Sequence, residues 1–306
     1  MSKYPINSDF KPLENKKPLF LPMLFSMSNK RSEKYLSKIE IPDNLNVTPV
    51  SIHGYENAEI NLKIYTPKLS NPDKALVYFH GGSFAYKEAP YQINLYIDYA
   101  VKTPCKVISV DYRLLPDHTY PTALEDCYAA VQWVHTHAEA LGIDKNKIAV
   151  GGDDTGGALA AGVTLLARER NAFNIGFQML IQPVTSMKMT TPSMRTFTDT
   201  PMWNSRLNQK MWKYYLKDCT DTQFASPLDM SNHDNLPASY IETAEFDCLR
   251  DEGTAYAKVL ERSGIDVELN ETKGTVHNFD VVENSEITIQ HKNKRIQALQ
   301  RYFNSI

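Results

Sequence analysis

The chain has 306 residues, of which 42% are apolar and 23% are charged, and its formal net charge is −3. This length suits one large α/β domain with a sizeable core. The chain lacks the basic excess that a phosphate-tracking surface needs, so we expect no nucleic-acid partner. The apolar stretch 19–25 is interrupted by Pro22, and no run reaches the ~18 apolar residues of a membrane span. We therefore expect a cytoplasmic protein without a secretion signal or a membrane partner.

The four cysteines are Cys105, Cys127, Cys219 and Cys248. They form no CxxC pair and show no metal-ligand spacing. Cysteines of this kind are typical of reduced thiols in or near a core. We therefore expect no metal site.

Short apolar runs recur along the chain from residue 59 onward, and turn residues end most of them. Residues 60, 62 and 64 alternate with polar ones, as in a half-buried strand. Further runs lie at 75–79, 106–110, 147–150, 178–181, 238–243 and 267–270. Continuous apolar strands are typical of a parallel sheet covered on both faces. Apolar residues at helical spacing predict helices at 121–141 and 157–170, and the alternation of strand and helix indicates the α/β class.

Two regions fall outside this alternation. Residues 1–50 are polar, Lys-rich and dotted with aromatic residues, and residues 187–221 are rich in Met, Trp and Tyr. Such side chains line adaptable pockets, but they also serve as ordinary packing, and both interpretations stay open.

The motif GGDDTGG at residues 151–157 follows an apolar strand and precedes a helix. Gly152 and Gly156 suit a turn too sharp for side chains, which leaves Asp154 at its apex. Thr155 then offers a backbone N–H at a helix N-terminus, where negative charge is favoured. This pattern predicts a nucleophile elbow. A phosphate loop is excluded because no GK[ST] follows.

Three further features belong to the same chemistry. HGGSF at residues 80–84 follows a strand, and its two glycines let backbone N–H groups approach a developing oxyanion closely. Asp247 and His277 each follow a predicted strand. The order of elbow, acid and histidine along the chain is that of a hydrolase triad.

The segments HGGSF, DYRLLPDHTYPTALEDC, GGDDTGG, AEFDCLRDEG and GTVHNF resemble the successive landmarks of the hormone-sensitive-lipase-like carboxylesterase family, over roughly residues 45–305. The resemblance implies an α/β-hydrolase fold: one domain over residues 1–306, with a mostly parallel eight-stranded sheet and helices on both faces. It also implies a helical cap formed by about 1–45 and 187–225. Members are mostly cofactor-free hydrolases of small esters, so we expect a small-molecule substrate and no cofactor. A homodimer stays open, because relatives often pair through the edge strand and last helix.

The resemblance also assigns roles to residues by their position in the motifs. Gly81, Gly82 and Thr155 would donate backbone N–H groups to an oxyanion. His277 would be the base, oriented by Asp247. With two carboxylates near one imidazole, we expect His277 to hold its proton more tightly than usual.

The chain departs from the family at the centre of the site. The family elbow reads GDSAGG, whereas residues 152–157 read GDDTGG, so Asp154 stands at the position of the nucleophilic serine. A carboxylate that attacks an ester carbonyl is itself the better leaving group, so the intermediate reverts. Carboxylate nucleophiles in this fold attack saturated carbon instead.

Three interpretations follow from this departure. The chain is an active hydrolase of small ester or related carbonyl substrates that uses Asp154 as nucleophile or base. Alternatively, it is a catalytically inactive ligand-binding protein on an esterase scaffold, or a serine esterase whose nucleophile was replaced deliberately. The first is favoured because HGGSF, Asp247 and His277 are all present, and a pure binder has no physical need for the acid–histidine pair.

Overall fold

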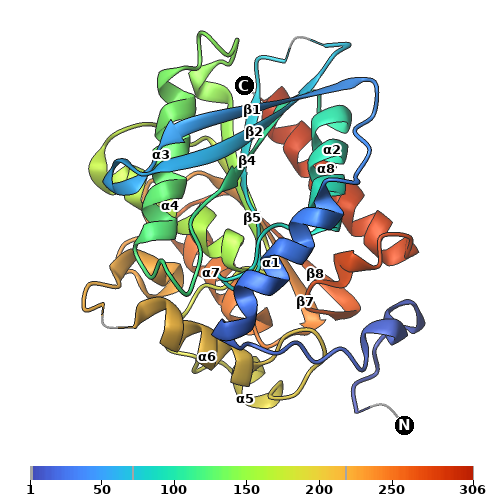
Figure 1. Cartoon of the computed structure of the whole chain (residues 1–306). Coiled ribbons are helices and arrows are strands. Elements are labelled where there is room, and N and C mark those ends of the chain that lie inside the picture. Colours follow the sequence, from blue (N-terminus) through green and yellow to red (C-terminus); the bar gives the residue numbers. More distant parts are fainter. Residues whose placement is uncertain (1–2, 71, 218, 306) are drawn as a thin grey trace.

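The computed structural model describes residues 3–70, 72–217 and 219–305. Within this part of the chain, one eight-stranded sheet has the order β1-β2-β4-β3-β5-β6-β7-β8 (Figure 1). The strands are β1 (Leu45–His53), β2 (Glu59–Pro67), β3 (Ala75–Phe79), β4 (Lys106–Asp111), β5 (Ile148–Asp153), β6 (Phe177–Ile181), β7 (Ala238–Phe246) and β8 (Val267–Val276). β2 runs antiparallel to both β1 and β4. The other neighbouring pairs of the sheet, in the order β4-β3-β5-β6-β7-β8, are parallel.

Helices connect these strands and cover both faces of the sheet. They are α1 (Pro22–Leu36), α2 (Pro90–Lys102), α3 (Thr122–Thr136), α4 (Thr155–Arg170), α5 (Pro192–Thr196), α6 (Ser205–Leu216), α7 (Arg250–Arg262) and α8 (Glu286–Asn304). Short 3₁₀ turns lie at Ser8–Leu13, Tyr55–Asn57, Lys145–Lys147, Gln223–Ala225, Pro227–Asp229 and Phe279–Val281.

The side chains of β3 show how the two faces are filled. Leu76 and Tyr78 pack with α2 and α8 on one face, while Val77 and Phe79 pack with α3, α4 and α7 on the other. Successive residues of a strand point to opposite faces, so a strand covered on both sides must be apolar throughout. Every residue of β3, β5 and β6 is buried. The predicted mostly parallel eight-stranded sheet, with helices on both faces, is therefore confirmed.

Two local predictions differ from the structure. Residues 45–50, expected to belong to the irregular N-terminal region, form with residues 51–53 the edge strand β1, in which five of the nine residues are exposed. Pro49 obscures it in the sequence, but an edge strand tolerates proline because one side of its ladder is free. The helix predicted at 121–141 ends at Thr136, and Gly142, at a φ of +65°, lies beyond it.

Two segments outside the sheet meet each other at one end of the molecule. One carries α1 and the other carries α5 and α6, the regions for which a cap is predicted (Figure 1). The ring of Phe20 lies 6.3 Å from that of Trp203 and 5.9 Å from that of Tyr214, centroid to centroid. Aromatic contacts therefore join the two segments across nearly 200 residues of sequence.

A buried ion cluster fixes α8 against the end of the sheet. The guanidinium of Arg295 is fully buried and pairs with Glu242 of β7 and with Asp280, where Nη1 lies 2.9 Å from Oδ1. Asp280 follows His277 by three residues, so this cluster also anchors the segment that carries the histidine. A buried charge left without its partner is costly, which makes the cluster sensitive to single substitutions.

We predict that Arg295→Met lowers the free energy of unfolding by about 3–5 kcal/mol, because it leaves two buried carboxylates without a cation. Arg301→Met is the matched control on the same helix, since Arg301 pairs with Glu268 at an exposed position. The control should lose at most about 1 kcal/mol. Urea unfolding monitored by circular dichroism measures both variants. Equal, small losses in the two would contradict the role given to the buried cluster.

Candidate active site

A sharp turn between β5 and α4 presents Asp154. Its φ of 53° and ψ of −120° are unusual for a residue other than glycine. A Cβ at Gly156 would collide with the backbone carbonyl of Phe79, and one at Gly152 would collide with the carbonyl of Gly156. Only glycine fits at these two positions, so the sequence of the turn forces the Asp154 side chain outward. This is the geometry of a nucleophile elbow.

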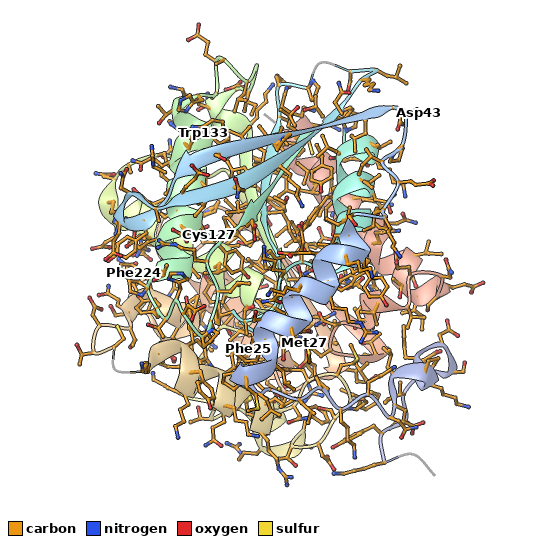
Figure 2. All side chains as sticks on the ribbon, in the orientation of Figure 1. Phe25, Met27, Asp43, Cys127, Trp133 and Phe224 are labelled. Carbon is orange, nitrogen blue, oxygen red and sulfur yellow. The ribbon has the colours of Figure 1, made fainter. Side chains whose placement is uncertain are left out.

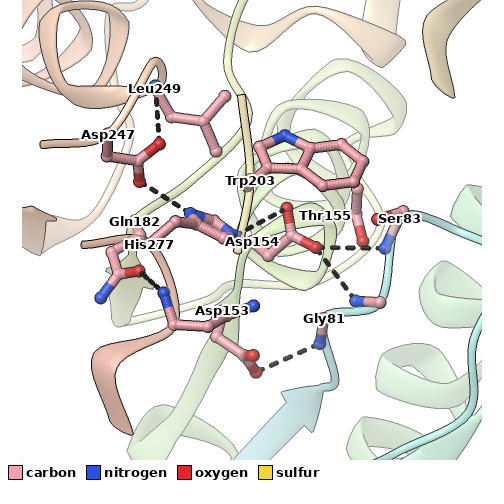
Figure 3. Close-up of polar contacts among 12 residues, drawn as sticks. Gly81, Ser83, Asp153, Asp154, Thr155, Gln182, Trp203, Asp247, Leu249 and His277 are labelled. Atoms are coloured by element: carbon pink, nitrogen blue, oxygen red, sulfur yellow. Dashed lines mark hydrogen bonds and ion pairs between the residues drawn. The ribbon is translucent and has the colours of Figure 1, made fainter. Parts of the chain in front are cut away.

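The two oxygens of the Asp154 carboxylate have different surroundings (Figure 3). Oδ2 accepts hydrogen bonds from the backbone N–H groups of Gly82 at 3.0 Å and Ser83 at 3.1 Å. Oδ1 is buried, has no hydrogen-bond partner among the described residues, and lies 3.6 Å from Nε2 of His277. Oδ2 is therefore fixed by two hydrogen bonds, whereas the lone pairs of Oδ1 accept no hydrogen bond from a described residue.

His277 lies between two carboxylates. Its Nδ1 is 2.7 Å from Oδ2 of Asp247, whose Oδ1 accepts a hydrogen bond from the backbone N–H of Leu249. Burial acts to lower the pKa of His277, but the charges of Asp247 and Asp154 outweigh it and raise the pKa to about 9. The resting site consequently holds an imidazolium, in the direction that the sequence predicts.

The two backbone N–H groups that donate to Asp154 belong to Gly82 and Ser83, whereas the sequence predicts Gly81 and Gly82 as donors in this loop. The N–H of Gly81 donates to Oδ1 of Asp153 at 3.1 Å and not to Asp154. Burial and then the charge of Asp154 raise the pKa of Asp153, and the N–H of Gly81 opposes that shift. Ser83 takes the place expected of Gly81. The sequence offered only the small side chain after HGG as a signal for it.

The loop that supplies these donors has an unusual backbone. Gly82, Ser83 and Phe84 all have positive φ, at 130°, 58° and 57°. The hydroxyl of Thr155 accepts a hydrogen bond from the N–H of Phe84 at 3.3 Å. The Phe84 ring stacks on Tyr215 of α6, with centroids 3.6 Å apart and planes within 6°. That the backbone N–H of Thr155 faces the oxyanion position stays a prediction.

The structure thus brings together Asp154, Asp247 and His277. The first and the last of these residues lie 123 positions apart in the sequence. Their exposed fractions are 2%, 0% and 1%, so the site is closed to solvent in this conformation. Trp203 borders it, with its ring centroid 6.2 Å from that of His277. Among the described residues, no cluster of three or more His, Cys, Asp or Glu side chains could hold a metal ion.

Comparisons with known proteins agree with this fold and site. Residues 76–281 match the model of the alpha/beta hydrolase fold family. The chain is 33% identical to Esterase LipI of Mycobacterium tuberculosis, over 80% of this chain and 78% of that protein. It is 34% identical to an arylesterase of Saccharolobus solfataricus, over 73% and 74% of the two chains. The structure of a bacterial heroin esterase superposes with a TM-score of 0.90 at 32% identity and covers 97% of this chain and 98% of that one.

The chain therefore belongs to the α/β-hydrolase fold family. Within that family its relatives are carboxylesterases of the hormone-sensitive-lipase-like type, and it is a carboxylesterase-like hydrolase. No described helix has the length and apolar character needed to cross a bilayer.

We predict that an NMR titration finds the pKa of His277 near 9, and a lower pKa in Asp154→Asn, which lacks one of the two carboxylate charges. A raised pKa contributes stability that is complete below the unfolded value of 6.5 and is lost as the pH rises through about 9. The free energy of unfolding should therefore fall across that interval by more in the unaltered protein than in Asp154→Asn. A His277 pKa below 6.5 contradicts this electrostatic description.

Proposed function

We propose that this protein is a hydrolase of small molecules in which Asp154 is a covalent nucleophile for saturated carbon. The observation that carries the proposal is the division of the Asp154 carboxylate. Oδ2 is held by the N–H groups of Gly82 and Ser83, while Oδ1 is unbonded and faces His277. A substrate carbonyl cannot use these two N–H groups while Oδ2 occupies them, so this conformation favours an electrophile that needs no oxyanion hole in its first step.

In the first step, a lone pair on Oδ1 of Asp154 forms a bond to the substrate carbon, and the leaving group departs with the electrons of the broken bond. An epoxide or an alkyl halide provides such a carbon. A halide leaves as its anion, whereas the epoxide oxygen stays on the alkyl group as an alkoxide and takes the proton of the His277 imidazolium. The product is an ester between Asp154 and the alkyl group. Its carbonyl oxygen is Oδ2, which already lies against the two N–H donors, so the intermediate forms with its oxyanion hole in place.

In the second step, water cleaves that ester. Alkylation removes the charge of Asp154, one of the interactions that raise the pKa of His277, so the imidazole more readily gives up its proton. The proton goes to the alkoxide of an opened epoxide, or to solvent when the leaving group is a halide, and the neutral imidazole is then a base. Nε2 takes a proton from water, the hydroxide adds to Cγ of Asp154, and the negative charge on Oδ2 faces Gly82 and Ser83. Collapse breaks the Cγ–Oδ1 bond, and the departing alkoxide takes the proton held by His277 and leaves as an alcohol. The carboxylic acid formed on Asp154 then passes its proton to His277, which restores the carboxylate and the imidazolium.

Substrate entry requires the site to open. Asp154, His277 and Trp203 are at most 5% exposed. The described parts of the segments 1–45 and 187–225 meet at Phe20, Trp203 and Tyr214, and we assign the two segments the role of a cap. Phe84 and Tyr215 connect α6 to the loop that binds Oδ2, so the cap contacts the reacting group through only one layer of side chains.

One observation favours a second candidate function, ligand binding without turnover. The charges of the site are already matched, because Asp154 fills the two N–H donors and also pairs with the imidazolium of His277. Reaction at Oδ1 would remove the ion pair between Asp154 and His277, which a binding site would keep. The two functions differ in whether a covalent bond to Asp154 ever forms.

We predict that incubating His277→Ala with a panel of epoxides and alkyl halides increases the intact mass of the protein by one alkyl group, located on Asp154 by peptide mapping. The substitution removes the base of the second step, so the ester accumulates. The double variant Asp154→Asn/His277→Ala is the matched control and should gain no mass. If no reagent modifies Asp154, although members of the panel bind, the nucleophile proposal fails and the binding function takes its place.

A further inference from the structure

The outward face of α1 and of the segment before it exposes a group of large apolar side chains. Leu19 is 66% exposed, Leu21 40%, Met23 83% and Met27 65%. We call these four residues the α1 apolar patch. Figure 2 shows α1 crossing the front of the molecule, with Met27 on it. Isolated exposed apolar residues are ordinary in proteins, whereas four within nine positions form a continuous apolar surface.

The opposite face of the same segment is firmly packed. Phe25 is fully buried and lies edge-on against Tyr86, with centroids 5.1 Å apart. Asn29 bonds through its side chain to the carbonyl of Ala85 and accepts a hydrogen bond from the N–H of Lys87. The helix is therefore held in one rotational position, and the exposure of Met23 and Met27 follows from the fold.

The patch borders an apolar groove. This cavity of about 420 Å³ is lined by Leu19, Leu24, Met27 and Tyr86, with Arg31 among its polar residues. The hydroxyl of Tyr86 donates a hydrogen bond to the carbonyl of Leu19. An apolar chain fits such a groove, and Arg31 adds a positive charge to its lining.

The segment that carries the patch is itself basic. Residues 16–38 contain six Lys or Arg residues and one acid, Glu33, a net charge of +5 in a chain whose overall charge is −3. Lys30, Arg31 and Lys34 are exposed on α1 beside the methionines. Glu33 is already paired with Lys87 at 2.9 Å. An apolar patch within a basic surface is complementary to anionic lipid headgroups above an acyl layer.

We propose that the α1 apolar patch and its surrounding basic residues bind the surface of an anionic lipid bilayer. A second copy of the chain fits this surface poorly, since pairing it with itself brings two charges of +5 together. A nucleic acid has no use for the exposed methionine and leucine side chains. The expected absence of a membrane partner rested on the lack of an apolar span, and peripheral binding needs none.

The test is co-sedimentation of the full chain with phosphatidylcholine vesicles, with and without phosphatidylglycerol. We expect binding only to the vesicles that contain phosphatidylglycerol, and loss of that binding as salt is raised. Met23→Glu/Met27→Glu should weaken the apparent affinity at least about tenfold, because each methionine contributes apolar burial and each glutamate repels the headgroups. Lys30→Glu/Lys34→Glu should weaken it as well.

Leu69→Glu/Ile289→Glu is the matched control, since those residues are 92% and 43% exposed but lie outside the patch. This control should bind vesicles as the unaltered chain does, and circular dichroism should show all variants folded. The proposal is overturned if the chain binds neither vesicle, if it binds both equally, or if the control loses affinity equally. It is also overturned if light scattering shows a dimer that only Met23→Glu/Met27→Glu dissociates, without vesicle binding.

Discussion

The carboxylate of Asp154 accepts hydrogen bonds from the N–H groups of Gly82 and Ser83, and the rest of the site is arranged around that contact. A carboxylate oxygen of the protein itself thus occupies both donors. The contact fixes which oxygen of Asp154 is free and places a negative charge beside His277, which raises the pKa of the imidazole.

Thr155, the residue after Asp154 in the elbow, also contacts the loop that supplies the donors. Its hydroxyl accepts a hydrogen bond from the N–H of Phe84, directly after Ser83 in that loop. Phe84 in turn stacks on Tyr215 of α6. The elbow, the oxyanion loop and the cap region are therefore joined by contiguous contacts. Gly81 is used differently, because its N–H bonds to the buried Asp153.

The sequence predicts most of the framework because strand ends carry its chemistry. Buried strands such as β3 are apolar throughout, and β5 carries a charge only at its last residue, Asp153. The residues that follow such strands gather at one edge of the sheet, so the meeting of Asp154, Asp247 and His277 is foreseeable. The edge strand β1 cannot be predicted in this way, because it contains a proline and many exposed residues and so lacks the continuous apolar pattern of a buried strand. Nor can the choice of Ser83 over Gly81, which depends on three successive positive φ angles that no residue type dictates.

The central claim is that a complete esterase framework is redirected by the side chain of Asp154 alone. Hydrolysis of p-nitrophenyl acetate and butyrate by Asp154→Ser tests it most directly, with Asp154→Ser/His277→Ala as the control. Loss of a triad nucleophile commonly costs about 10⁶ in turnover, so the serine variant should gain at least about a hundredfold over the unaltered protein and lose that gain with His277. A folded Asp154→Ser variant that gains nothing, or an unaltered protein that already hydrolyses these esters rapidly, would contradict the account.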